Sequence, residues 1–279
     1  MAVYTSEELR AVQLIELEAL KEVVRVCDKL SIECFLVGGS CLGAMRHGGF
    51  IPWDDDIDVG MRREDYDRFL KEAPSILNNR FFLQTPYTDK NSAYSYAKVR
   101  VNGTMFVEYC NRKNKMHQGI YCDVFPFDNV PDDDTKNKKQ FVRFTRLNYI
   151  FFYRQTPDVS CPPNSIRDHF KSIVRKVMHY SLVLFTNKER LYRSLLSTAT
   201  EYNGKEQSSV ACLHFPKWKG DEILLSDLYP LKSVQFEGIT VKVPRNAEKY
   251  LTTHYGDWRT LPPESQQVGH KPYRVEISS

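Results

Sequence analysis

The chain has 279 residues, of which 42% are hydrophobic, so it can bury a full core in one elaborated domain or in a catalytic domain with an appendage. Its 39 basic and 35 acidic residues give a net charge of +4, a balance too even to indicate nucleic-acid binding. Seven cysteines without a C-x-x-C pair indicate neither a disulfide framework nor a zinc knuckle. No signal-peptide pattern and no run of roughly 18 apolar residues is present, so we expect a soluble or peripheral protein.

The N-terminal part of the chain alternates between helical and strand patterns. Thr5, with Glu8 three residues later, forms a capping-box pattern, and apolar residues follow at helical spacing, which predicts a long amphipathic helix. Residues 34–37 have the apolar run of a short buried strand. Ser40 follows this strand, and we expect it to cap a helix over 42–46.

Further strands and one helix are expected up to residue 128. Four segments have the apolar or alternating pattern of strands: 57–61, 81–84, 96–101 and 119–125. A helix is expected over 63–71, and Pro126 is expected to end the last strand, because proline cannot donate to a sheet ladder. The alternation predicts an α+β fold with α/β-like character, in which helices flank a mixed β-sheet.

The pattern changes after residue 128, and we expect three parts. Residues 1–128 are expected to form the catalytic core. Residues 129–235 are expected to form a mainly helical insertion that contacts either an acceptor substrate or a membrane. Residues 236–279 are expected to return to the core. This last part has a strand pattern over 239–243 and a helical pattern over 247–254.

The insertion contains a basic and apolar helical pattern. A charged linker over 132–139 leads to an apolar segment over 141–153. The pattern from Ser165 to about Tyr202 then mixes Arg and Lys with large apolar side chains. Such a helix either lies on an anionic membrane or packs against its own domain, and the sequence leaves both open.

Four carboxylates stand within five residues around the start of the 57–61 strand. Because side chains alternate along a strand, Asp56 and Asp58 project to one side, while Ile57 and Val59 point into the core. Carboxylates this close repel one another unless a cation compensates, and two on one strand suit Mg²⁺ or Mn²⁺. The two apolar residues disfavour a solvated acidic turn, and Val59 stands where an EF-hand loop needs glycine.

A glycine turn precedes this strand. Gly38 and Gly39 let the backbone approach a ligand closely, and the N–H groups at the start of the next helix favour a phosphate. By itself such a turn is a weak signal. Its combination with two carboxylates on the following strand is typical of a nucleotide-phosphate site with a metal ion.

One more carboxylate and three basic residues complete the expected site. Asp123 stands in an otherwise apolar strand, so it either pairs with Lys98 or Arg100 or serves as a third metal ligand and general base. Lys98 and Arg100 share one face of their strand, which is either solvent or the active cleft. Arg46 lies a short helix beyond the glycine turn and faces either a diphosphate or the aspartates.

The segment FLVGGSCLGAMRHGGFIPWDDDIDVGMRREDYDRFL, residues 35–70, resembles the signature of the LicD family of phospho-alcohol transferases, which also has animal relatives of the fukutin type. Three more blocks resemble family blocks in the expected order: YAKVRVNGT at 96–104, GIYCDVFPFD at 119–128 and YLTTHYGDWRTLPP at 250–263. The resemblance implies the nucleotidyltransferase superfold. It covers most of the chain outside 129–235.

In that superfold a glycine turn is followed by two carboxylates on one strand and a third on a later strand. The resemblance therefore implies that Asp56, Asp58 and Asp123 are both the catalytic residues and the ligands of Mg²⁺ or Mn²⁺. It also implies that donor phosphates bind the glycine turn and nearby basic residues: Gly38, Gly39, Ser40, Arg46, Lys98 and Arg100.

The implied reaction moves a phospho-alcohol, phosphorylcholine first, from a CDP-alcohol to a hydroxyl of a cell-surface or lipid-linked glycan and releases CMP. Such an enzyme would serve lipopolysaccharide biosynthesis or the modification of a capsule or teichoic acid. It would work in the cytoplasm or peripherally on the inner face of the membrane. No nucleic acid is expected as a partner.

Two other functions remain open at this point. A metal-dependent glycosyltransferase also uses D-x-D to bind a nucleotide sugar, although Asp56 comes early for that fold. A non-catalytic glycan-binding relative would have a degenerate site, whereas the three carboxylates and the glycine turn are all present. Basic residues of the tail either close over the cleft or are solvated: Arg259, His270, Lys271 and Arg274.

Overall fold

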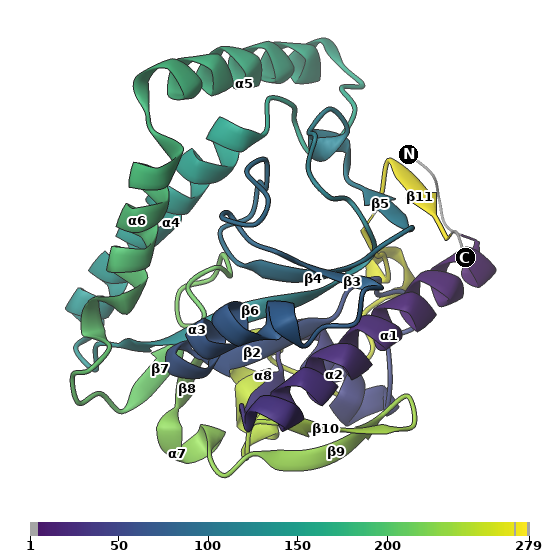
Figure 1. Ribbon diagram of the computed structural model, residues 1–279, viewed down its shortest axis with the longest axis vertical. Helices are drawn as coiled ribbons and strands as arrows, with labels where there is room; N and C mark the ends of the chain where they lie inside the picture. The colour runs from purple at the N-terminus through teal and green to yellow at the C-terminus, as the bar shows by residue number, and fades with distance from the viewer. Residues whose placement is uncertain (1–4, 271, 278–279) are drawn as a thin grey trace.

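The computed structural model describes residues 5–270 and 272–277, and a mixed β-sheet runs through its centre (Figure 1). The described residues form eight α-helices: α1 (Ser6–Leu30), α2 (Gly38–His47), α3 (Arg63–Glu72), α4 (Asp134–Gln155), α5 (Ile166–Phe185), α6 (Lys188–Ala199), α7 (Leu225–Leu228) and α8 (Ala247–Tyr255). Within the same ranges lie eleven β-strands: β1 (Cys34–Leu36), β2 (Asp58–Arg62), β3 (Phe81–Gln84), β4 (Ala97–Val101), β5 (Met105–Val107), β6 (Tyr121–Val130), β7 (Ser209–Ala211), β8 (Glu222–Leu224), β9 (Lys232–Phe236), β10 (Ile239–Val243) and β11 (Arg274–Glu276).

The central sheet combines parallel and antiparallel pairing. Its strand order is β1-β2-β6-β4-β3, and the second half of β6 also pairs with β7, which pairs with β8. Strands β2 and β6 run parallel, and the other neighbours run antiparallel. Strands β9 and β10 form a hairpin of their own, and β5 pairs with β11. This mixed sheet with flanking helices confirms the predicted α+β class.

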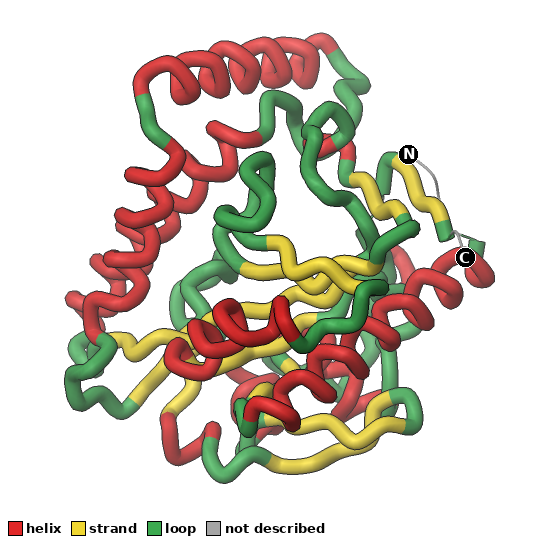
Figure 2. Tube along the Cα trace, viewed as in Figure 1, coloured by secondary structure: helices red, strands yellow, loops and turns green. Residues whose placement is uncertain are grey.

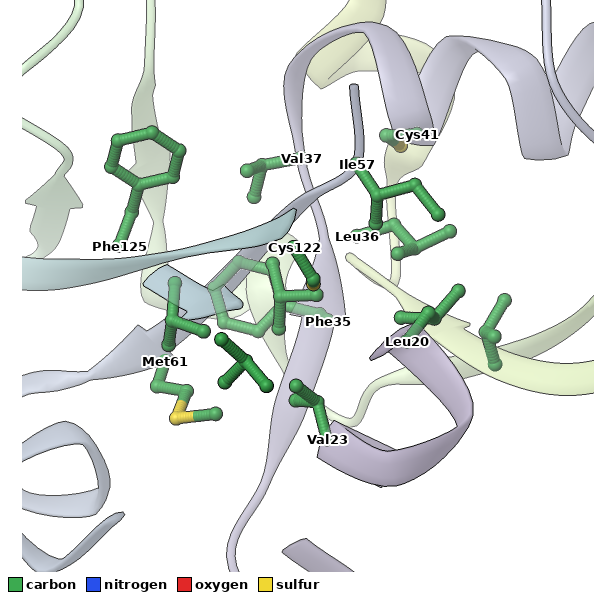
Figure 3. Close-up of a cluster of buried hydrophobic side chains, with 14 of the residues drawn as sticks. Leu20, Val23, Phe35, Leu36, Val37, Cys41, Ile57, Met61, Cys122 and Phe125 are labelled. Atoms are coloured by element: carbon green, nitrogen blue, oxygen red, sulfur yellow. The ribbon is translucent and has the colours of Figure 1, made fainter. Parts of the chain in front are cut away.

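Helix α1 forms as the sequence predicts and packs against the sheet. The hydroxyl of Thr5 accepts a hydrogen bond from the N–H of Glu8, whose carboxylate accepts the N–H of Thr5, so the capping box is complete. Buried side chains at helical spacing, among them Leu20 and Val23, meet Phe35 of β1 in the core (Figure 3). Burial of each such side chain contributes about 1.5–3 kcal/mol.

The start of α2 corrects one local prediction. The helix begins at Gly38, so Ser40 lies inside it, and the N-cap position belongs to Val37, which has no side-chain acceptor. Gly38 has a φ of +53°, a left-handed conformation that glycine adopts without strain. The glycine turn and the helix start are therefore one element.

Strand β6 also differs from the prediction, because it continues past Pro126 to Val130. The N–H of Asp123 donates to the carbonyl of Ile57, next to β2. Backbone groups alternate sides along a strand, so the nitrogen of Pro126 faces the opposite side. On that side of β6, pairing with β4 ends at Val124 and pairing with β7 begins only at Asp128. The absence of an N–H group on Pro126 therefore removes no hydrogen bond from the sheet.

The region after β6 starts with three helices. Figure 2 shows α4 and α6 side by side, with α5 across one end of the pair. The expected charged linker is wrong for most of its length, because α4 already begins at Asp134, and Asp133 caps it. The long basic pattern is divided into α5 and α6 near Asn187, which caps α6. Strands β7, β8 and β9 and helix α7 follow, and the tail contributes β10 and α8 as predicted.

Candidate active site

Asp58 and Asp123 lie opposite each other on neighbouring parallel strands. Asp58 begins β2 and is the register partner of Asp123 on β6, which is in turn the register partner of Lys98 on β4. Register partners point to the same face of a sheet. The sheet therefore brings together in one row three residues that the sequence predicts for the site.

The strand that carries Asp58 is anchored to helix α2. The N–H of Asp58 donates to Oγ of Ser40 at 2.8 Å, and the N–H of Val37 donates to the carbonyl oxygen of Asp58 at 3.1 Å. The N–H of Gly38 donates to the hydroxyl of Tyr250 at 2.9 Å, which ties the turn to α8. The buried Ser40 hydroxyl is thus directed at the strand, where it positions Asp58.

The glycine turn lies directly against two carboxylates. A Cβ atom on Gly38 would lie 3.0 Å from Oδ2 of Asp58. One on Gly39 would lie 2.7 Å from Oδ2 of Asp54, closer than real Cβ contacts allow. The N–H groups of Gly39 and Ser40, at the start of α2, have no acceptor within the described residues. They are available to an anion.

Asp56 and Asp58 lie where two cavities meet. The large cavity, of about 700 Å³, contains the glycine turn, and the small cavity, of about 210 Å³, contains Asp123. Phe215 also lines both. The wall of the large cavity further includes aromatic and polar side chains: Arg46, Trp53, Tyr255, Trp258 and Gln266. The two aspartates can therefore contact ligand groups in either cavity.

The small cavity holds a buried ammonium group. Nζ of Lys98 lies 2.6 Å from one carboxylate oxygen of Asp123 and 2.9 Å from the other. The same nitrogen lies 3.5 Å from the ring centroid of Tyr121, 4.3 Å from that of Tyr94 and 5.3 Å from that of Tyr96. The ion pair and the ring faces together compensate for the burial of this charge.

The two predicted arginines differ in their position. Arg46 lines the large cavity and donates to the carbonyl oxygen of Trp258 at 2.7 Å. Arg100 is 1% exposed, and its guanidinium donates to Oε1 of Gln84 and to the carbonyl of Gly119, at 2.8 and 2.7 Å. Those contacts tie β4 to neighbouring segments, so the structure does not bring Arg100 to either cavity.

Comparison with known proteins relates part of this chain to a family. The family model described as "LicD/FKTN/FKRP, nucleotidyltransferase domain" matches residues 31–157. Over 266 residues, 94% of this chain and 95% of the relative, the chain is 27% identical to the lipopolysaccharide cholinephosphotransferase LicD of Haemophilus influenzae. The chain carries a LicD-family domain. It is also 32% identical to the ribitol 5-phosphate transferase FKRP of Mus musculus, over 42% of this chain and 22% of that relative.

The LicD-family domain contains every predicted site residue, but it does not complete the cavity walls. Tyr255, Trp258 and Gln266 of the large cavity lie beyond residue 157, in a tail of which sequence reasoning offered only basic residues to the cleft. The family block at 250–263 was the signal that could have found Trp258. The ring of tyrosines around Lys98 was also missed, because their shared cavity depends on contacts between segments that are distant in the sequence.

The tail also places a histidine on the acidic loop. The backbone N–H and Nδ1 of His270 both donate to Oδ1 of Asp55 at 2.9 Å. The hydrogen bond with Asp55 raises the pKa of His270 to about 10, so the imidazole is a cation at neutral pH. Arg259 and Arg274 form ion pairs elsewhere on the surface, and Lys271 lies outside the described residues.

The carboxylates of the candidate site carry more negative charge than their neighbours compensate. Burial raises the pKa of Asp58 well above its usual range, and repulsion from Asp56 and Asp123 adds to the effect. Burial raises the pKa of Asp56 to about 6, although His270 opposes the shift. Lys98 compensates for Asp123, but no basic side chain in the described part of the chain pairs with Asp58. The His270 imidazole lies 3.8 Å from the carboxylate of Asp56, so Asp58 is the carboxylate that lacks a positive partner.

A divalent cation fits these two carboxylates. Mg²⁺ commonly binds one or two carboxylates together with substrate phosphates and keeps several waters. Residues 5–270 and 272–277 contain no group of three or more His, Cys, Asp and Glu side chains arranged to hold a metal ion, and Asp123 is engaged by Lys98. The arrangement therefore suits an ion shared between Asp56, Asp58 and a phosphate better than an ion enclosed by protein ligands alone.

Proposed function

We propose that this protein transfers a phospho-alcohol, phosphorylcholine above others, from a CDP-alcohol to a hydroxyl of a glycan and releases CMP. The position of Asp56 and Asp58 at the junction of two cavities carries the proposal, because a donor diphosphate joins a nucleotide to an alcohol. The relatives support the reaction class. One is named a cholinephosphotransferase and the other a ribitol 5-phosphate transferase, so each moves a phospho-alcohol.

The large cavity is suited to the nucleotide half of the donor. Trp53 and Trp258 provide flat faces for a pyrimidine base, and Arg46 provides a cation for its phosphate. The free N–H groups of Gly39 and Ser40 offer two more donors to the diphosphate at the start of α2. These groups hold the donor with its distal phosphorus at the junction.

Mg²⁺ or Mn²⁺ would be held by Asp56 and Asp58 together with the donor diphosphate. When bound there, such an ion neutralises the charge that develops on the phosphate oxygens during transfer. Without a cation, five buried or half-buried carboxylates, Asp54, Asp55, Asp56, Asp58 and Asp123, would repel the diphosphate. Because Gly38 and Gly39 have no side chain, the backbone lies close to the carboxylates. The diphosphate and the carboxylates can then both contact the cation where the two cavities meet.

The small cavity suits a cationic alcohol. It is lined by three tyrosines, by Phe125 and by the carboxylate of Glu108, which accepts a hydrogen bond from the hydroxyl of Tyr94. Ring faces and carboxylates favour a quaternary ammonium such as choline over an uncharged polyol. Lys98 already places an ammonium on these rings, and this contact supports a cavity wall that favours positive charge.

Asp123 is the proton acceptor in this proposal. The acceptor oxygen forms a bond to the distal phosphorus, the bond from that phosphorus to the oxygen of CMP breaks, and the hydroxyl proton passes to Asp123. Burial raises the pKa of Asp123, while the Lys98 ammonium opposes the shift. The carboxylate is therefore more basic than an aspartate in water, and the adjacent ammonium favours its ionised form, as a general base requires.

The acceptor is a glycan or a lipid-linked glycan, as the name of the lipopolysaccharide-modifying relative suggests. Capsule or teichoic acid precursors have the same hydroxyl chemistry. We place the reaction in the reducing cytoplasm, because all seven cysteines are free thiols.

CMP release by the purified protein tests the proposal. The protein would be incubated with Mg²⁺ and, in turn, CDP-choline, CDP-ethanolamine, CDP-glycerol and CDP-ribitol, with UDP-sugars as the comparison. Release from CDP-choline above the others is expected, and Asp58→Asn should abolish it. Asp257→Asn is the matched control, since Asp257 lines the same large cavity but bonds to Thr260. Release of UDP from a nucleotide sugar, with none from any CDP-alcohol, would refute the proposal in favour of a glycosyltransferase.

A further inference from the structure

Helix α5 exposes a large apolar face. Of the 19 large apolar side chains that are exposed among the described residues, nine lie on this one helix. The most exposed are Ile166 at 92%, Phe185 at 80%, Leu184 at 76%, and Phe170 and Tyr180 at 66%. An apolar face of this extent on a single helix is unusual for a protein surface and indicates an interaction site.

The helix faces the protein with its polar side, the reverse of an ordinary surface helix. Arg175 is 7% exposed, donates to the hydroxyl of Thr156 and stacks on the ring of Tyr153, 3.6 Å from its centroid. Nδ1 of His179, one turn along, lies 3.2 Å from the carbonyl oxygen of Tyr153. Since these contacts hold the polar side against α4, the apolar side is directed outward.

Basic residues border the apolar face on both sides. By helical geometry, Ile166, Ile173, Val177 and Leu184 form the middle of the exposed stripe, whereas Arg167 and Lys171 follow one border and Lys176 the other. Asp168, paired with Lys171, is the acidic residue of the helix. An apolar stripe between basic borders is the pattern of a helix that lies in the surface of an anionic bilayer.

The position of α5 allows it to lie flat on such a surface. Figure 1 shows the helix at one end of the molecule, across the ends of α4 and α6, with its length along the outer surface. None of the helices in the described ranges has the length and hydropathy needed to cross a membrane. A second copy of the chain is a poorer occupant, because a symmetric pair of α5 helices would bring their basic borders together.

We propose that α5 docks the protein on anionic lipid, with its apolar stripe among the acyl chains and its basic borders on the headgroups. The bilayer then covers the apolar face of α5, which is exposed in the structure. The inference stands apart from the proposed function, because lipid binding requires neither donor nor metal. If both hold, α5 brings the active site to acceptors carried on lipid.

Flotation of the full chain with vesicles tests the proposal. Vesicles of phosphatidylglycerol with phosphatidylcholine would be compared with vesicles of phosphatidylcholine alone. We expect the protein to float with the anionic vesicles, and Phe170→Asp with Val177→Asp to weaken binding roughly tenfold or more. Lys171→Glu with Lys176→Glu should weaken binding at low salt. Val142→Asp, at an exposed apolar position on α4, is the matched control and should float like the parent.

A second control separates α5 from general electrostatic attraction. A basic hollow of about 1410 Å³ lies between α4 and α6 and is lined by Lys138, Lys139, Arg143, Arg146, Arg190 and Arg193. Arg146→Glu with Arg193→Glu should leave flotation unchanged. Loss of flotation in this variant but not in the α5 variants, or no flotation of the parent protein, would overturn the proposal. A dimer in the absence of lipid that Phe170→Asp with Val177→Asp converts to a monomer would also overturn it, and unchanged thermal unfolding would show that the variants fold.

Discussion

Lys98 and Asp123 form a buried ion pair in which one ammonium nitrogen contacts both carboxylate oxygens, at 2.6 and 2.9 Å. Neither side chain is more than 7% exposed. Burial lowers the pKa of Lys98 and raises that of Asp123, and each partner opposes the shift of the other. Each group therefore favours the charged form of the other inside the sheet, beside the proposed reaction centre.

Removal of Lys98 should have a structural and a catalytic effect that a second substitution can separate. Lys98→Met leaves the Asp123 carboxylate buried without a partner, so we expect the free energy of unfolding to fall by about 3 kcal/mol. Lys98→Met with Asp123→Asn should regain most of that stability, while CMP release stays absent in both variants. Urea unfolding and the release assay measure the two effects. A double variant no more stable than Lys98→Met would contradict an energetic coupling between the two residues.

Asp58→Asn should stabilise the protein and abolish its response to Mg²⁺. Because burial and like charges raise the pKa of Asp58, its ionised form is costly at neutral pH, and a neutral amide removes that cost. Thermal unfolding should therefore show a higher midpoint in the variant without metal. With excess Mg²⁺ and a CDP-alcohol, the parent should gain about 2–3 kcal/mol and the variant nothing. Asp54→Asn removes a carboxylate from the same loop and should keep the gain; equal gains in parent and Asp58→Asn would exclude Asp58 as a ligand.

Gly39→Ala should impair donor binding. Alanine within a helix normally stabilises by about 1 kcal/mol relative to glycine. Here the added Cβ would lie 2.7 Å from Oδ2 of Asp54, so this carboxylate, which lines the large cavity, must move. We expect a raised KM for the CDP-alcohol and no gain in stability. Gly39→Ala with Asp54→Ala removes the clash and should show the helix stabilisation; a stabilised single variant with an unchanged KM would show that the turn tolerates the methyl group.

The local patterns of the sequence are sufficient to predict most helices and strands, because capping residues and apolar spacing act within one element. The Thr5 and Glu8 capping box appears in the structure where it was expected, and Ile57 and Val59 are buried as expected. The pairing of Lys98 with Asp123 was left as one of several options. It depends on the order β2-β6-β4, which is set by packing between distant segments and not by any local pattern.

What the sequence analysis predicted wrongly or missed also depends on packing between distant segments. Pro126 remains within a strand because β6 changes its neighbour at that point, a fact that no residue near Pro126 reveals. Trp258 reaches the large cavity because α8 packs on α2. Glu16 could have been noticed, since it falls on the apolar stripe of α1 with Val12 and Val23.

Glu16 is fully buried, and neither carboxylate oxygen has a hydrogen-bond partner within the described residues. Burial raises its pKa well above the usual range, and the charges of Asp56, Asp55 and Asp54 add to the shift. The folded protein therefore binds this proton more tightly than the unfolded chain does. The resulting stabilisation is complete below the unfolded pKa, about 4.3, and is lost as the pH rises through the folded pKa.

Glu16→Gln should remove this pH dependence. The amide stays neutral, so stability relative to the parent should rise by about 1.4 kcal/mol for each pH unit between the unfolded and folded pKa values. Unfolding by urea at several pH values between about 5 and 8, in the presence of EDTA, measures the difference. Glu18→Gln is the matched control, because Glu18 is exposed on the same helix and pairs with Arg80. Its curve should run parallel to that of the parent, and a parallel curve for Glu16→Gln would mean that Glu16 is ionised and stabilised in the folded protein.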